Sequence, residues 1–259
     1  MKVVIFAGGL GTRLSEETTL KPKPMVEIGG KPILWHIMKI YAHYGYNEFV
    51  ICLGYKGHMI KEYFINYFLY NTDISVQTAT NQIDIHNTPT DSFKVTLVDT
   101  GAETNTAGRL KRIQQYVKGE TFMLTYGDGV ADVNIPKLLD FHQKHGKIAT
   151  LTSITLPSRF GNLKTDDEGA VLKFEEKSDD DGILINGGFF VLNPDVFNYL
   201  EGDMDTIQWE RKPLAAITHD GELRTYKHHG FWKCMDAMRD KSELEEMWAS
   251  GHAQWKIWQ

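Results

Sequence analysis

Apolar runs and amphipathic segments alternate along the first half of this chain. The runs at Lys2–Phe6 and Glu48–Leu53 have the composition of buried parallel strands, because a strand covered on both faces lacks polar alternation. Helices are expected after each run, the first from Pro32 to about Gly45 and the second over Lys56–Phe68. This strand–helix–strand–helix order predicts a parallel sheet with right-handed crossovers.

The same periodicity predicts further elements. A strand is expected at Ile74–Thr78, followed by an exposed loop or hairpin over Asn81–Asp91. Beyond residue 155 the alternation loosens into short strand-like pieces, which predicts a second, more antiparallel half. Strands are expected at 95–98, 122–125, 149–155, 162–164, 171–175, 183–192 and 223–226, and helices at 106–117, 135–145, 194–200, 209–218 and 237–250.

A glycine-rich turn with nearby cations follows the first strand. In Ala7–Leu14 (AGGLGTRL) the glycines allow backbone N–H groups to approach phosphate oxygens without interference from a Cβ atom. Arg13 adds a planar, permanently charged group suited to a polyphosphate. Lys21 and Lys23 alternate with prolines that restrict the backbone, so both are presented on a stiff segment. This stretch predicts a phosphate-binding site.

Three other interpretations of the turn are weaker. A dinucleotide-binding turn would need a third glycine where Leu14 stands, and an acidic residue after the second strand, which runs into Gly54 and Tyr55. A P-loop fails because no Gly-Lys-Ser/Thr follows. A purely structural turn does not explain why Arg13, Lys21 and Lys23 gather near one loop.

Composition narrows the choice of partners and compartment. The 259 residues carry a net charge of −6, so a nucleic-acid partner is not expected, and phosphate must be met by local cations. No apolar run approaches the length of a membrane span, and no signal peptide is recognised. The two cysteines, Cys52 and Cys234, do not form a disulfide framework. These features predict a cytoplasmic protein that acts away from the membrane.

The glycine-rich turn and its proline-flanked lysines resemble the signature of the sugar-nucleotide pyrophosphorylases, the nucleotidyltransferases that act on sugar 1-phosphates. The resemblance covers nearly the whole chain. Further matching segments are Tyr126–Gly129 (YGDG), Glu175–Lys177 (EEK), Ile185–Phe190 (INGGFF) and Gly230–Asp236 (GFWKCMD). The stretch from Lys21 to His36 is most similar to members that join CTP to glucose 1-phosphate.

The resemblance implies the fold and the reaction. The fold would be α/β, a Rossmann-like mixed sheet flanked by helices, in a single nucleotidyltransferase domain over 1–259. Residues 1–153 would form the nucleotide-binding half, and 154–259 the sugar-binding half with a closing helix. CTP and glucose 1-phosphate would give CDP-glucose and pyrophosphate, with Mg²⁺ as cofactor. The family also implies a homo-oligomer, for which a hexamer is one size considered.

Site residues carry over by position. Lys23 would be the main catalytic cation at the α-phosphate, assisted by Arg13. Asp128 and Asp236 would hold Mg²⁺, Glu176 would accept hydrogen bonds from sugar hydroxyls, Lys177 would meet the sugar phosphate, and Gly188 would let the sugar approach. The nucleotide-binding set would be Phe6, Ala7, Gly8, Gly9, Leu10, Gly11, Thr12, Arg13, Lys23, Thr104, Arg109 and Gly127.

Several alternatives stay open at this point. The base could be thymine or uracil, the sugar could differ, or the chain could be a catalytically silent sensor. Ser178 stands where the family usually has proline, and Lys164 where the cytidylyltransferases have an acidic residue, so the identity of the sugar stays open. Neither Asp128 nor Asp236 has a lysine or arginine next to it in the sequence that would explain it as a simple ion pair, which favours the metal role. The alternative is that Asp236 caps the closing helix, whose first residue is Ala237.

Two other features have ordinary explanations. His142 and His145 lie one helical turn apart, and with no further metal ligand nearby we expect a solvated helix face. Trp248, Trp255 and Trp258 predict a C-terminal segment docked on an apolar surface, either as part of the core or as a subunit interface.

Overall fold

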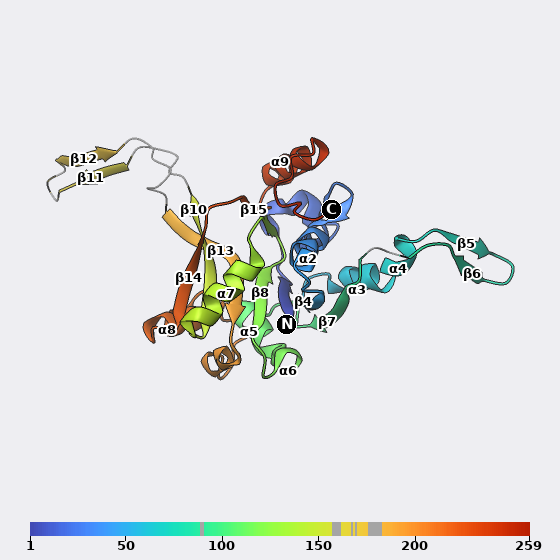
Figure 1. The fold of residues 1–259 in the computed structure, drawn as a ribbon, viewed down its shortest axis with the longest axis horizontal. Helices are drawn as coiled ribbons and strands as arrows, with labels where there is room; N and C mark the ends of the chain where they lie inside the picture. Colours follow the sequence, from blue (N-terminus) through green and yellow to red (C-terminus); the bar gives the residue numbers. More distant parts are fainter. Residues whose placement is uncertain (89–90, 157–161, 167, 169, 176–182) are drawn as a thin grey trace.

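A seven-stranded mixed sheet forms the centre of the molecule (Figure 1). The computed structural model describes all residues except 89–90, 157–161, 167, 169 and 176–182, and the side chains of 156, 162–165 and 173–175. The strand order is β14-β10-β13-β8-β1-β4-β7. The bounds are β1 Val3–Ala7, β4 Glu48–Leu53, β7 Lys94–Asp99, β8 Phe122–Tyr126, β10 Ala149–Leu156, β13 Ile183–Leu192 and β14 Leu223–His228.

Within the central sheet, the first-half strands β7, β4, β1 and β8 are parallel, as predicted. In β1, Ile5 pairs with Ile51 of β4 on one side and with Thr125 of β8 on the other. In the second half β13 runs antiparallel to both β8 and β10, and β14 is parallel to β10. The sheet is therefore continuous through both predicted halves, and β13 introduces the mixed character.

Two hydrophobic layers cover the sheet, one on each face. Val3, Ile5 and Ala7 of β1 belong to one core cluster, whereas Val4 and Phe6 belong to the other, because successive side chains of a strand point to opposite faces. The first cluster includes residues of α2 Ile33–His43, α3 Gly57–Ile65, α7 Ile135–His145 and α9 Met238–Ala249, and the second includes residues of α5 Thr106–Arg112, α6 Gln114–Val117, η3 Pro194–Tyr199 and α8 Lys212–His219.

Most predicted helices are present, with differences at their ends. The helix expected over Lys56–Phe68 is divided at Asn66 into α3 and α4 Tyr67–Tyr70, and the one expected over 106–117 is divided at Ile113. Trp209 lies before α8, which begins at Lys212. The remaining short elements are η1 Thr12–Leu14, α1 Ser15–Thr18, η2 Lys23–Met25, β2 Glu27–Ile28, β3 Lys31–Pro32, β9 Gly129–Ala131 and β15 Trp232–Cys234.

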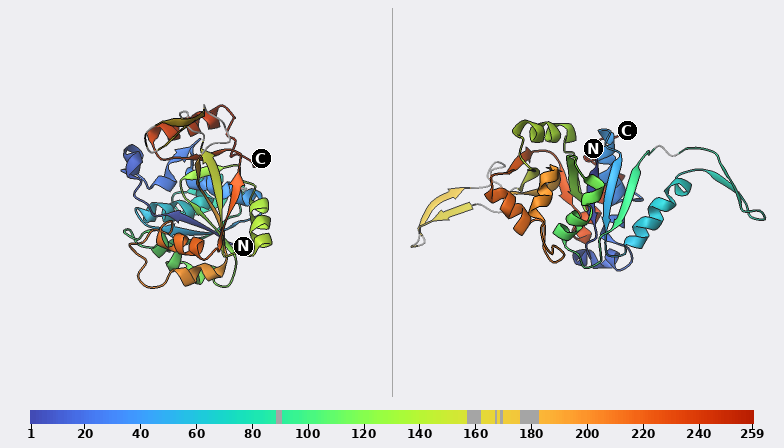
Figure 2. Two further views of the ribbon diagram at one scale, coloured as in Figure 1. Left: turned by 90° about the vertical axis from the view of Figure 1, so that its left-hand side faces the viewer. Right: turned by 90° about the horizontal axis from the view of Figure 1, so that it is seen from below.

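Two hairpins extend from opposite ends of the body (Figures 1 and 2). One consists of β5 Ile74–Gln77, the strand expected at Ile74–Thr78, paired with β6 Gln82–Ile85, which lies in the segment Asn81–Asp91 where an exposed loop or hairpin was expected. The other consists of β11 Asn162–Thr165 and β12 Val171–Glu175. Every residue of β5 and β6 is exposed, although these strands carry four isoleucine or valine residues.

The C-terminal tryptophans pack on their own chain. Trp255 is fully buried and stacks on Phe231, with 5.6 Å between ring centroids. Trp248 and Trp258 both contact the ring of His36 in α2, which fixes the tail against that helix. The tail therefore has the core role, one of the two roles considered for it.

His142 corrects the expectation of a solvated face. Its ring is 2% exposed and hydrogen-bonds the Thr150 hydroxyl and the Asn193 side chain, at 2.8 and 3.1 Å. His145 hydrogen-bonds the same hydroxyl at 2.6 Å. The pair thus joins α7 to the neighbouring strands.

Among the described residues, no helix combines the length and apolar character needed to cross a bilayer.

Candidate active site

A cleft lies where β1 and β8 end, at their carboxyl edge. In open α/β sheets this edge is where ligands bind. The cleft brings together thirteen of the predicted residues, which are Phe6, Ala7, Gly8, Gly9, Gly11, Thr12, Arg13, Lys23, Thr104, Arg109, Gly127, Asp128 and Asp236. Leu10 is half exposed beside the cleft and does not line it. Pro24, Asn105, Thr106 and Tyr126 complete the lining and were not predicted.

Two glycines of the first turn, Gly8 and Gly11, are required by close packing or by backbone geometry. Gly11 has a φ of +64°, and a Cβ atom there would lie 2.7 Å from the Thr18 Cγ2 atom. The Thr18 hydroxyl donates to the carbonyl oxygens of Gly11 or Leu14, each at 3.0 Å, and so fixes the turn from within. A side chain at Gly8 would overlap the Arg109 guanidinium, at 2.2 Å. The loop is therefore tightly held while its outer side faces the cleft.

Arg109 supports the loops that surround the cleft. Its side chain is almost fully buried and donates to the carbonyl oxygens of Leu53, Gly8 and Ala102, at 2.9, 3.1 and 3.3 Å, and to the Thr100 hydroxyl at 2.7 Å. Burial lowers the pKa of the guanidinium, which these acceptors still satisfy. The sequence predicts Arg109 as a nucleotide contact; the structure adds that it holds the ends of β1, β4 and β7 together.

Lys23 bridges two carboxylates at the centre of the cleft. Its ammonium lies 2.8 Å from Asp128 Oδ2 and 2.6 Å from Asp236 Oδ1, and Arg13 lies 3.1 Å from Asp236 Oδ2. Burial alone would lower the pKa of Lys23, but the adjacent carboxylates outweigh it and the pKa is raised. For Asp236, burial is likewise outweighed by Lys23 and Arg13, and the pKa is lowered. Both aspartates are thus paired with cations that are distant from them in the sequence.

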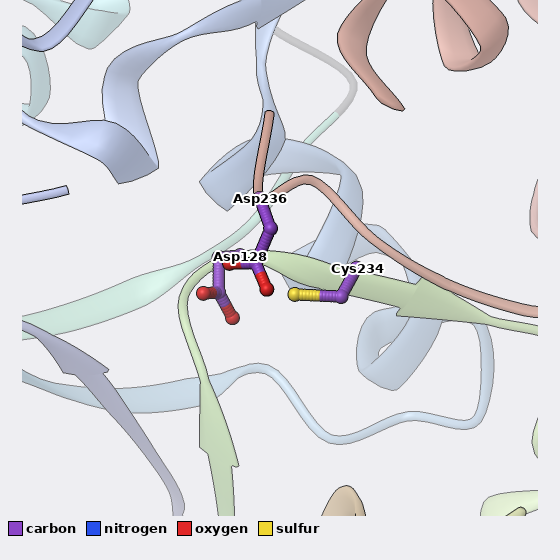
Figure 3. A group of neighbouring side chains, drawn as sticks. All are labelled: Asp128, Cys234 and Asp236. Carbon is purple, nitrogen blue, oxygen red and sulfur yellow. The ribbon is translucent and has the colours of Figure 1, made fainter. Parts of the chain in front are cut away.

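Asp128, Asp236 and Cys234 form a group that could hold a metal ion (Figure 3). One potential ligand atom from each lies within 4.8 Å of the other two. The two carboxylates fit Mg²⁺, which prefers oxygen ligands and commonly binds through one or two carboxylates plus substrate phosphates. Burial raises the pKa of the Cys234 thiol, so the sulfur stays protonated without a metal and is a poor ligand for a hard cation.

The alternative that Asp236 caps the closing helix is not supported. The N-cap of α9 is Ala237, and the Oδ2 atom of Asp240 at position N3 accepts from the backbone N–H groups of Asp236 and Ala237, at 3.0 and 2.9 Å. The Asp236 carboxylate instead points to Lys23 and Arg13. The Asp236 side chain is thus free of the helix and belongs to the cleft.

A second pocket adjoins the first across Asp128 and Asp236. Gly188 lines it with Asn186, Trp232 and Cys234. Gly188 has a φ of +82°, and a Cβ atom there would lie 2.7 Å from the Tyr126 ring. Glu176, Lys177 and Ser178 lie outside the described residues, as does the side chain of Lys164, so the structure does not place these predicted sugar contacts.

Tyr126 forms the wall between the two pockets. Its hydroxyl donates to Glu210 Oε1 at 2.5 Å, and the Thr106 hydroxyl donates to the other oxygen of Glu210 at 2.8 Å. Burial, followed by the charge of Glu210, raises the pKa of Tyr126. The sequence shows Tyr126 beside the Gly127-Asp128 motif, but Glu210 lies 84 residues away and has no comparable signal.

Comparisons with known proteins agree on one class. The chain matches the nucleotidyl transferase family over residues 2–232. It is 55% identical over 260 aligned residues to glucose-1-phosphate cytidylyltransferase of Salmonella typhi, covering all of both chains. Its fold is similar to that of HddC from Yersinia pseudotuberculosis, with a TM-score of 0.69 and 23% sequence identity. The match covers 95% of this chain and 99% of HddC. Its fold is also similar to that of a UDP-glucose pyrophosphorylase, with a TM-score of 0.66 and 18% sequence identity. The match covers 96% of this chain and 98% of the pyrophosphorylase.

Proposed function

Because this chain belongs to the nucleotidyl transferase family, we propose that it joins CTP and glucose 1-phosphate into CDP-glucose and releases pyrophosphate. The full-length identity to the Salmonella typhi cytidylyltransferase carries this proposal. The cleft supports it, since a glycine-rich loop, two cations and two carboxylates converge beside a second pocket. The expected α/β fold with a mixed, helix-flanked sheet is confirmed.

The reaction requires charge stabilisation more than proton transfer. An oxygen of the sugar phosphate attacks the α-phosphorus of CTP, the new P–O bond forms, and the bond to the leaving pyrophosphate breaks in line. The sugar phosphate is already an anion near pH 7, so no general base is needed. The obstacle is the approach of two polyanions, which fixed cations and backbone N–H groups reduce. Lys23 and Arg13, which both contact Asp236 in the cleft, would supply these cations.

The first pocket is assigned to the nucleotide. Backbone N–H groups of the glycine-rich loop would bind the triphosphate, and Lys23 would contact the α-phosphate. Thr104 and Gly127 would contact the nucleoside, and Arg109 would hold the loops beneath it. Asp128 and Asp236 would hold Mg²⁺, which supplies positive charge to the phosphate oxygens when it is bound.

The second pocket is assigned to the sugar, with Gly188 leaving room for the ring and with Glu176 and Lys177 as predicted contacts. Substituting Glu176→Ala should raise KM for glucose 1-phosphate severalfold and leave KM for CTP nearly unchanged, because lost hydrogen bonds reach the sugar alone. Initial rates at varied concentrations of each substrate test this. Equal changes in both constants would contradict the division into two pockets.

A homo-oligomer and a cytoplasmic location are further parts of the proposal. The exposed apolar side chains of the β5–β6 hairpin, Ile74, Val76, Ile83 and Ile85, support self-association, since strands of this kind usually find a partner. Sedimentation at micromolar concentration measures the oligomer, and a monomer would refute it. Both cysteines carry free thiols, which fits a reducing compartment.

The decisive experiment measures pyrophosphate release with each of four nucleoside triphosphates against a panel of sugar 1-phosphates. We expect CTP with glucose 1-phosphate to give the highest kcat/KM. A higher value with UTP or dTTP, or with another sugar, would replace the base or the sugar and keep the reaction. No release with any pair would instead support a non-catalytic sensor of nucleotide sugars.

A further inference from the structure

One cation occupies the space between the carboxylates that are proposed to hold the metal. Lys23 Nζ contacts Asp128 Oδ2 at 2.8 Å and Asp236 Oδ1 at 2.6 Å, and its side chain is 12% exposed. Both aspartates belong to the group in which one potential ligand atom from each residue lies within 4.8 Å of the others. A divalent cation bound by both carboxylates would therefore have to share that space with an ammonium or displace it.

Charge makes displacement the favourable choice. Two carboxylates, Lys23 and Arg13 together carry no net charge, so without a metal the cluster is already neutralised. A divalent ion entering beside Lys23 would face the repulsion of a cation within a few ångströms, in a partly buried site where screening by water is weak. The phosphates of a nucleotide offer the lysine an alternative anionic partner in the same cleft.

The backbone favours movement of the lysine side chain by itself. Pro22 and Pro24 flank Lys23, and the short η2 turn is closed by a hydrogen bond from Met25 N–H to the Pro22 carbonyl oxygen at 2.8 Å and one from Val26 N–H to the Lys23 carbonyl oxygen at 3.1 Å. The four-carbon stem can rotate while its Cα atom stays fixed. The ammonium can thus change partners without a loop rearrangement.

We propose that Lys23 is the internal counter-ion of the metal site, and that it leaves Asp128 and Asp236 for the phosphate when a metal–nucleotide complex binds. The inference rests on the proposed function only for the identity of the site as a metal site. Its consequence is that Lys23 opposes metal binding in the absence of nucleotide. The divalent cation and the nucleotide should then each strengthen binding of the other, because coupling between two sites is reciprocal.

The test measures Mn²⁺ binding to nucleotide-free protein by electron paramagnetic resonance. Replacing Lys23→Met keeps the length and apolar stem of the side chain and removes its charge. We expect the Kd for Mn²⁺ to fall tenfold or more in this variant. Lys21→Met is the matched control, because Lys21 pairs with Glu27 at 3.0 Å outside the cleft, and its Kd should equal that of the wild type.

Further variants keep the outcome interpretable. Adding Asp236→Asn to Lys23→Met should reverse the gain, which ties the bound ion to this carboxylate. If Lys23→Met melts at a lower temperature than the wild type, Lys23→Gln replaces it in the same measurement. A Kd that is unchanged or higher in folded Lys23 variants would overturn the inference. The proposed reaction would be unaffected by that result, because the binding assay contains neither CTP nor sugar phosphate.

Discussion

Two lysine–aspartate clusters in this molecule differ in how many partners each carboxylate has. In the cleft, one ammonium is shared between Asp128 and Asp236, and Arg13 reaches the second of these from a side chain that is 77% exposed. Beside α2, the single carboxylate of Asp91 accepts from Lys39 at 2.7 Å, Trp35 at 2.9 Å and Tyr67 at 2.6 Å. The first cluster has few donors for its oxygens, and the second has many.

The surroundings reinforce this difference. Asp91 is 9% exposed, and Lys39 also lies 5.5 Å from the ring centroid of Trp35, so its charge is held by an aromatic face as well. The Asp91 cluster joins α2 to Tyr67 in α4, ahead of the exposed hairpin. The Asp91 cluster stabilises the fold, whereas the cleft cluster retains oxygens and cations that a ligand can use. Ion pairs of similar length can thus serve stability in one place and chemistry in another.

The largest expected effect comes from the cleft. Lys23→Ala should lower kcat roughly 100-fold or more, because it removes the charge that stabilises the reacting phosphate. Stopped-flow or coupled detection of pyrophosphate measures it. Lys21→Ala, which breaks a peripheral pair with Glu27, should be much milder. Equal losses in the two variants would remove the assignment of Lys23.

The carboxylates proposed to hold the metal should give the next largest effect. Asp236→Asn should lower activity by about tenfold or more and raise the Mg²⁺ concentration needed for half-maximal rate, because an amide oxygen is a weaker ligand than a carboxylate. Asp128→Asn should behave alike. Asp240 still accepts from the backbone N–H groups of residues 236 and 237 in both variants, so the melting temperature should change little. Normal Mg²⁺ dependence in either variant would exclude that residue as a ligand.

A substitution in the Asp91 cluster should instead lower stability and leave activity unchanged. Asp91→Asn should lower the free energy of unfolding by about 2 kcal/mol, since it leaves Lys39 partly buried without its counter-charge. The kcat of the folded variant should match the wild type. Urea unfolding and steady-state rates measure the two quantities. A large loss of kcat with unchanged stability would erase the distinction between the clusters.

The Asp91 cluster also predicts that stability depends on pH. Burial would raise the pKa of Asp91, but Lys39, Tyr67 and Trp35 outweigh it and the pKa is lowered. A carboxyl whose pKa is lower in the folded state contributes stability above its unfolded pKa of about 3.9, and this contribution is lost as the pH falls through the folded pKa. The stability difference between wild type and Asp91→Asn should therefore shrink below about pH 4. A difference that grows on acidification would contradict this account.

The smallest effect is expected from removing the Tyr67 hydroxyl of the Asp91 cluster. Tyr67→Phe removes the donor at 2.6 Å and leaves Asp91 with Lys39 and Trp35, so stability should fall by about 1 kcal/mol. Tyr70→Phe is the matched control in the same short helix, because Tyr70 is 66% exposed. Similar urea midpoints for the two variants would show that the Tyr67 hydroxyl contributes little.

The chain's local patterns determined most elements and the composition of the cleft. β4, α7 and β13 have the bounds that periodicity predicts, because burial on one or both faces is recorded directly in the spacing of apolar residues. The glycine-rich turn and Lys23 are recognisable because their chemistry constrains residue type at short spacing, whereas the two aspartates, which lie far apart in the sequence, were predicted through the family resemblance. Local signals of this kind can be recognised without the tertiary structure.

Only the tertiary structure decided which side chains are partners. Lys23 meets Asp236 across 213 residues, Arg109 contacts the Gly8 carbonyl oxygen across 101, and Asp91 meets Trp35 across 56. No periodicity encodes such contacts, because they depend on how the strands are ordered in the sheet and on which loops meet at its edge. The sequence therefore determined that a phosphate-binding cleft with acidic residues exists, and folding decided that its lysine lies between its carboxylates.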